Sequence, residues 1–139
     1  MSVVSPSTHD MDTMRGWWEQ GGDEIELFSR EVLGLPFAER SMSGGVAERV
    51  VEQHLESPAM WAIFLMQDLL AMDEALRRAD PAKERINVPA VIPYYWRYRM
   101  HLTIDELSKS QAYLARLRGM IERSGRSSLG GREISTTIP

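Results

Sequence analysis

Apolar and polar residues follow one another along this chain with a period that changes from segment to segment, and each period predicts a secondary-structure element. Two short apolar runs predict β-strands. The first is Val3-Val4. The second covers residues 60–66 and is apolar throughout, as expected for a parallel strand that is buried on both faces. A buried helix gives the same pattern, so periodicity leaves both assignments open for 60–66.

Elsewhere, apolar residues recur at helical spacing and predict helices. Asp10 or Asp12 can cap the first helix, Ser43 the third and Asp68 the fourth, because short polar side chains accept hydrogen bonds from the free amides of a first turn. The last helix begins with a capping box, Thr103-Ile104-Asp105-Glu106. The predicted helices run through Met14 and Trp18, over 23–33, over 46–55, from Asp68 through Leu76, and from Ile104 to near Gly125.

Each predicted strand is followed by polar residues and then by a helix, which is the βα unit of a parallel α/β fold. In a (β/α)8 barrel, polar groups just past the C-terminal end of a strand are where catalysis is built. Thr8-His9-Asp10 follow the first strand, and Asp68 follows the second. The His-Asp pair is a candidate site, although a solvated turn gives the same pair. Asp68 is either a helix cap or a ligand-binding group.

Residues 77–101 form a long predicted connection, and a loop of this length in a compact domain is usually functional. It carries Asn87 and then a run of aromatic residues interleaved with arginines. Such a run binds RNA, sugars or a partner, or it packs the loop onto its own scaffold. After Arg126 the chain has no hydrophobic period, so 127–139 are predicted to be a disordered tail.

Composition narrows the class of protein. The 139 residues suffice for one domain, and 16 basic against 20 acidic side chains give a net charge of −4 without a basic stripe for nucleic acid. There is no cysteine, and the three histidines lack the spacing of a helical zinc pair. No apolar run reaches membrane-spanning length, and the first residues do not resemble a secretory signal. These features predict a cytoplasmic globular segment.

Five groups of residues follow one another in order along the chain: Ser7-Thr8-His9-Asp10-Met11 with Arg15-Gly16-Trp17-Trp18-Glu19, Ser57-Pro58-Ala59-Met60-Trp61, Gln67-Asp68-Leu69-Leu70, Arg85-Ile86-Asn87-Val88-Pro89, and Tyr95-Trp96-Arg97-Tyr98-Arg99-Met100. Together they resemble the C-terminal end of 4-α-glucanotransferases, the amylomaltase or disproportionating-enzyme family. The likeness is greatest to the long branch of that family, whose members carry carbohydrate-binding modules ahead of the barrel. It extends from about Ser2 to Gly125.

The resemblance implies a (β/α)8 barrel that transfers α-1,4-glucan segments between maltooligosaccharides with retention and without a metal or organic cofactor. Retention through a covalent glycosyl-enzyme needs a nucleophilic carboxylate and an acid/base carboxylate. By the same likeness, Asp10 matches a third family carboxylate, which stabilises the transition state. His9, Thr8 and Asn87 match substrate-binding positions. Trp96, Arg97 and Arg99 match motif residues that we expect to be structural.

In the family, the nucleophile and the acid/base lie upstream of Thr-His-Asp, where this chain has only residues 1–7. Two strands cannot close a barrel, and a complete one needs roughly 250 residues. We therefore expect residues 1–126 to be the C-terminal portion of a barrel, mostly helical with two short parallel strands. We also expect this piece to be inactive alone, because it lacks the N-terminal part of the barrel.

Two other classes of function compete with this reading. One is a stand-alone helical interaction module that descends from the barrel, lacks catalysis and pairs through exposed apolar faces. Its weakness is that such a module has no chemical need for the Thr8, His9, Asp10 and Asn87 side chains. The other is an aromatic and arginine-rich nucleic-acid binder, which the negative net charge and the dispersed basic residues disfavour.

Overall fold

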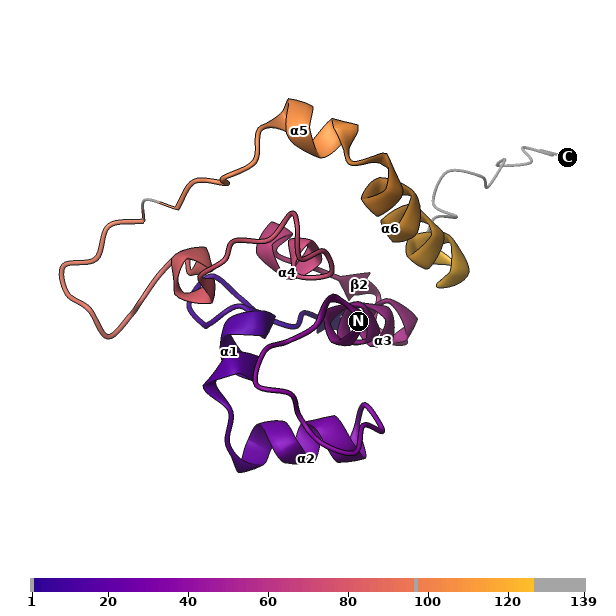
Figure 1. Cartoon of the computed structure of the whole chain (residues 1–139), viewed down its shortest axis with the longest axis horizontal. Helices are drawn as coiled ribbons and strands as arrows, with labels where there is room; N and C mark the ends of the chain where they lie inside the picture. Colours follow the sequence, from indigo (N-terminus) through magenta and orange to yellow (C-terminus); the bar gives the residue numbers. More distant parts are fainter. Residues whose placement is uncertain (1, 97, 127–139) are drawn as a thin grey trace, which may run out of the picture.

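The computed structural model describes residues 2–96 and 98–126. Figure 1 shows helices arranged around one very small sheet, with a long loop that leaves the helices and returns to them. In chain order the elements are β1 (Val3–Val4), α1 (Met14–Gln20), α2 (Asp23–Glu31), α3 (Gly44–Glu56), β2 (Trp61–Ala62), α4 (Met66–Leu70), the 3-10 helix η1 (Pro81–Glu84), α5 (Ile104–Lys109) and α6 (Gln111–Arg123). The described part of the chain is mostly helical with two short parallel strands, as the sequence predicts.

The sheet consists of β1 and β2, which pair in parallel with Val3 opposite Trp61 and Val4 opposite Ala62. The Ile63 amide extends the pairing by donating to the Val4 carbonyl at 2.9 Å. The predicted strand over 60–66 is therefore too long. Nor is it buried on both faces, because Trp61 is 53% exposed and Ile63 is also exposed. Among the described residues β2 pairs with β1 alone, and its two strand residues are followed by residues 63–65 before α4 begins at Met66.

Helix α1 is capped by Thr13, whose hydroxyl accepts from the Gly16 amide at 3.1 Å. The prediction of Asp10 or Asp12 as the cap was wrong. The Asp12 carboxylate instead accepts a hydrogen bond from Gln20 and pairs with Arg85. Ser43 does cap α3, because its hydroxyl accepts from the Val46 amide, and this prediction is confirmed.

Helix α4 begins before Asp68, so the prediction of Asp68 as its cap was wrong. Leu65 is the cap residue, and Asp68 lies in the first turn with its side chain turned toward other elements. The Thr103–Glu106 capping box is confirmed at the start of α5. The single helix predicted from Ile104 breaks at Ser110, where the hydroxyl bonds the Glu106 carbonyl in competition with the helix ladder.

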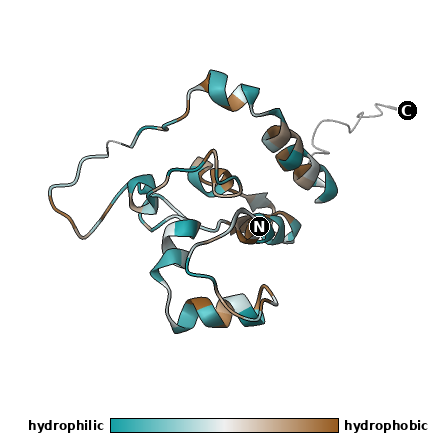
Figure 2. Ribbon diagram, in the orientation of Figure 1, coloured by the Kyte–Doolittle hydropathy of each residue, from teal (hydrophilic) through white to brown (hydrophobic). Residues whose placement is uncertain are grey.

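The core lies where α1 and α3 meet the segment that follows α4. Helix α6 packs against α3, and its Arg116 donates to the Met72 carbonyl of that segment at 3.0 Å. Brown and teal alternate along α2 and α6 in Figure 2, as expected for helices with one face on a core. Gly44 lets α3 approach the chain after α4, because a Cβ there would lie 2.6 Å from the Met72 carbonyl oxygen. The largest side chains that are fully buried in this core are Trp18, Met42, Val51, Leu70, Met72 and Met120.

Candidate functional site

The loop between β1 and α1 carries Thr8, His9 and Asp10, and all three are exposed. The Met11 amide donates to the Thr8 carbonyl at 3.2 Å, so Thr8 forms a turn that presents the next two side chains. The structure therefore places these three predicted residues just past the C-terminal end of β1.

Asn87 reaches the same loop from the long connection after η1. Its side-chain amide donates to Asp10 Oδ1 at 2.6 Å, across 77 positions of sequence. Its backbone amide donates to the His9 carbonyl at 3.0 Å. The fold thus brings together His9, Asp10 and Asn87, which the sequence predicted as site residues from two distant segments.

His9 links this site to an aromatic residue. Its Nε2 lies 3.2 Å from Asp10 Oδ2, so a proton on Nε2 can be shared with that carboxylate. The imidazole also packs against the indole of Trp96, with the ring centroids 4.9 Å apart and the planes tilted by 46°. The family motif predicts a structural role for Trp96, and nothing in the sequence indicates its contact with His9. Arg97, from the same motif, lies outside the described residues.

Residues 10–15 and 84–87 run in opposite directions and face each other through successive side chains. Asp10 meets Asn87, Arg85 Nη1 lies 3.1 Å from Asp12 Oδ1, and Arg15 Nη2 lies 3.1 Å from Glu84 Oε1. We call these three pairs the side-chain ladder. It ties the long connection to the Thr8–Asp10 loop and so fixes Asn87 beside Asp10.

The inner end of the side-chain ladder is buried. Both Arg15 and Glu84 are almost completely inaccessible, and Arg15 also donates to the Arg78 carbonyl at 2.6 Å. Burial raises the pKa of Glu84 above its ordinary value of 4.5, and the charge of Arg15 opposes that rise. Removing either partner would leave the other without its counter-ion in the interior.

Asp68 supports the same loop from α4. The Ser7 hydroxyl donates to Asp68 Oδ2, and the Met14 amide donates to Asp68 Oδ1 at 2.8 Å. Burial raises the pKa of Asp68 above its ordinary value of 3.8, while these two hydrogen bonds act in the opposite direction. Because Asp68 is fully buried, it does not reach a ligand directly, and its role is to hold both ends of the loop.

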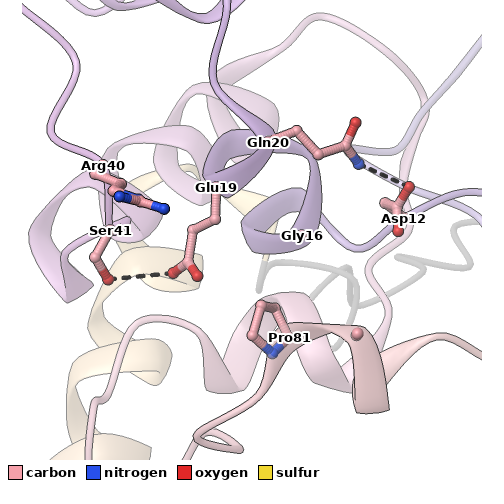
Figure 3. A pocket seen from close by; sticks show the side chains of 8 residues that line it. Asp12, Gly16, Glu19, Gln20, Arg40, Ser41 and Pro81 are labelled. Atoms are coloured by element: carbon pink, nitrogen blue, oxygen red, sulfur yellow. Dashed lines mark hydrogen bonds between the residues drawn. The ribbon is translucent and has the colours of Figure 1, made fainter.

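A pocket of about 520 Å³ lies beside the side-chain ladder, between α1, η1 and residues 40–41. Figure 3 shows Asp12 held by Gln20 on one side of this pocket, and Glu19 accepting from Ser41 on another. Thr8, His9, Asp10 and Asn87 do not line it. The predicted site is instead an open surface, on which a carboxylate, an imidazole and an amide are available to the hydroxyls of a ligand.

Residues 2–96 and 98–126 contain no cluster of three or more His, Cys, Asp or Glu side chains with the geometry of a metal site. None of the helices described is long and apolar enough to cross a membrane.

Comparison with known proteins identifies the family. Residues 1–104 match the family model described as 4-alpha-glucanotransferase. The chain belongs to the 4-alpha-glucanotransferase family. The match includes all four predicted site residues and the whole side-chain ladder, so the geometry above lies within the family's own sequence region.

Three relatives illustrate the extent of the match. The chain is 38% identical over 128 residues to 4-alpha-glucanotransferase DPE2 of Oryza sativa subsp. japonica, covering 91% of this chain and 14% of that protein. It is 34% identical over 109 residues to the 4-alpha-glucanotransferase of Chlamydia muridarum, covering 78% of this chain and 20% of that protein. It is 32% identical over 123 residues to the chloroplastic/amyloplastic 4-alpha-glucanotransferase DPE1 of Oryza sativa subsp. japonica, covering 87% of this chain and 18% of that protein.

This chain therefore spans between about one seventh and one fifth of the length of these 4-alpha-glucanotransferases. Residues 105–126, which include most of α5 and all of α6, lie beyond the family-model match. The predicted tail, 127–139, lies outside the described residues.

Proposed function

We propose that this chain supplies the sugar-binding, transition-state-stabilising part of a retaining 4-α-glucanotransferase. In this proposal Asp10 stabilises the transition state, and His9, Thr8 and Asn87 bind the sugar. The substrates are maltooligosaccharides or longer α-glucans. The nucleophilic and acid/base carboxylates come from the part of the barrel that precedes Thr-His-Asp in the family, and neither a metal nor an organic cofactor is required.

The observation that carries the proposal is the convergence of Asn87 and His9 on the two carboxylate oxygens of Asp10. The retaining reaction passes through an oxocarbenium-like transition state. A carboxylate that is already held in place interacts more strongly with the sugar as positive charge develops, and it needs no reorganisation at that moment. Asn87 provides this restraint, and Asp68 and the side-chain ladder hold the loop beneath it.

We further propose that residues 1–126 form the C-terminal portion of a (β/α)8 barrel, with β1 and β2 as its last two strands. Three features support this assignment: the strands are parallel neighbours, helices α1 to α3 connect them, and each strand is followed by a polar loop or helix start. Val3, Trp61 and Ile63 are exposed around this two-stranded sheet. In the barrel, neighbouring elements would cover them and pair the open strand edges.

Titration of the full chain with maltoheptaose and with acarbose, followed by NMR, tests this proposal. Acarbose carries a basic nitrogen at the linkage that mimics the scissile bond. When protonated, this nitrogen places a positive charge where the reaction develops one. We expect Asp10→Asn to weaken maltoheptaose binding about tenfold and acarbose binding by more, because only acarbose loses a charge pairing. Asp23→Asn, at an exposed aspartate on α2, is the matched control and should leave both affinities unchanged.

Two outcomes would contradict the proposal. A folded chain that binds neither sugar would favour the alternative of a helical interaction module without catalysis. In that case the exposed apolar residues around β1 and β2 would be expected to mediate self-association or pairing with a protein, which sedimentation would detect. If Asp10→Asn weakens the binding of maltoheptaose and of acarbose by the same factor, the result would support a role of Asp10 in sugar binding and argue against a role in stabilising the transition state.

A further inference from the structure

Trp96 is an exposed aromatic residue placed directly beside the candidate site. Its side chain is 56% exposed, whereas Trp18, a core residue, is 1% exposed. Within the described residues its ring contact is with His9, whose imidazole also approaches the Asp10 carboxylate. Trp96 therefore contributes little to the core, and its position requires another explanation.

Both limbs of the loop that carries Trp96 are fastened to the rest of the molecule. On one limb, the Asn87 amides bond His9 and Asp10. On the other, Arg78 donates to the Arg99 carbonyl at 2.8 Å and lies 6.0 Å from the centroid of the Tyr98 ring. These anchors hold the indole over His9, although the segment between them forms the wide loop in Figure 1.

The chemistry of a pyranose ring matches this arrangement. Its hydroxyls project from the rim and need polar partners, while its C–H groups form an apolar face that packs on an aromatic ring. Asp10, His9 and Asn87 supply polar groups, and Trp96 supplies a flat apolar surface at their edge. An amphipathic indole suits this role, because burying its free face against a sugar removes apolar surface from water.

We propose that Trp96 is a stacking platform for a glucosyl unit adjacent to the one held by Asp10, so that the two residues define consecutive binding positions along an α-glucan. This inference rests on the proposed function and adds a specificity-determining residue to it. The bound glucan must be at least two glucosyl units long, because a single glucose would not occupy both positions.

Fluorine NMR on the full chain labelled with 5-fluorotryptophan tests the platform, since the chain has four tryptophans and the Trp96 signal is assigned by its loss in Trp96→Phe. We expect maltoheptaose to shift the Trp96 signal and to leave that of the buried Trp18 in place. Glucose at the same concentration of sugar units should shift it far less. Trp96→Ala should weaken maltoheptaose binding about tenfold, which corresponds to about 1.4 kcal/mol, while Trp96→Phe keeps most of the affinity.

Trp61→Ala is the matched control, because Trp61 is 53% exposed and belongs to β2 rather than to the loop. It should leave sugar affinity unchanged, and unchanged thermal melts of Trp96→Ala would exclude unfolding as the cause of its loss. If Asp10→Asn weakens maltoheptaose binding but Trp96→Ala does not, the stacking role of Trp96 is refuted and the proposed function stands. If the unmodified chain binds no maltoheptaose, both are overturned.

Discussion

The Asp68 carboxylate accepts a hydrogen bond from the Met14 amide at 2.8 Å, across 54 positions of sequence. Its other oxygen accepts from the Ser7 hydroxyl. Ser7 and Met14 are the two ends of the loop that presents Thr8, His9 and Asp10. One buried side chain on α4 therefore fixes both ends of the candidate sugar-binding loop, and it also satisfies an amide at the first turn of α1.

Replacing Asp68 with alanine should destabilise the chain by about 3 kcal/mol, because the Ser7 hydroxyl and the Met14 amide would both lose their buried partner. Asp68→Asn keeps an oxygen for Met14 and an amide group that can donate to Ser7, so we expect a loss of less than about 1 kcal/mol. Urea unfolding followed by circular dichroism measures both values. Equal losses in the two variants would contradict this assignment of hydrogen bonds.

The raised pKa values of Asp68 and Glu84 predict how stability changes with pH. Between the ordinary and the raised pKa, the folded state binds more protons than the unfolded chain. The contribution of each group to the stability of the fold is therefore fully present below its ordinary pKa. It is lost as the pH rises through its raised pKa. From about pH 4 to pH 7, Asp68→Asn should show a weaker fall in stability than the unmodified chain, and an identical pH dependence would contradict the prediction.

The buried pair of Arg15 and Glu84 should behave as a unit. Arg15→Met and Glu84→Gln should each destabilise the chain by about 3 kcal/mol, since each leaves one polar partner buried without its counterpart. The double variant should lose clearly less unfolding free energy than the sum of the losses in the two single variants. A double-mutant cycle of urea unfolding measures the difference. Additive losses would mean that the two side chains do not interact across the side-chain ladder.

Asn87 should affect sugar binding more than stability. Asn87→Ala removes the donor that orients Asp10 at an exposed position, so we expect a change in unfolding free energy below about 1 kcal/mol and a weakening of maltoheptaose binding of about fivefold. Gln53→Ala, at an exposed amide on α3, is the control and should leave the affinity unchanged. Unaltered binding in Asn87→Ala would show that Asp10 needs no restraint from this loop.

The chain by itself should not disproportionate maltotriose. Double displacement needs a nucleophile and an acid/base on opposite sides of the scissile bond, and Asp10 alone supplies neither role. Glucose release from maltotriose, measured with an enzymatic glucose assay, should equal that of an Asp10→Asn preparation. Release above that background, abolished by Asp10→Asn, would show that the described residues contain a complete active site.

Features that depend on residues close together in the chain could be predicted from the sequence. Ser43 and Thr103 cap helices because their hydroxyls reach amides three positions away. Hydrophobic spacing indicated where most helices lie, and the order of strand, polar loop and helix placed Thr8, His9 and Asp10 after a strand end. The ordered motifs also pointed to the 4-alpha-glucanotransferase family, to which the chain belongs.

Features that depend on residues far apart in the chain follow from the folded arrangement. Thr13 rather than Asp12 caps α1, because Arg85 engages the Asp12 carboxylate. The Asp68 carboxylate, in the first turn of α4, bonds the loop after β1 rather than the amides of its own helix, and Trp96 contacts His9. Spacing along a chain cannot indicate these pairings, since a carboxylate bonds whichever donor the packing of apolar surfaces brings within about 3 Å.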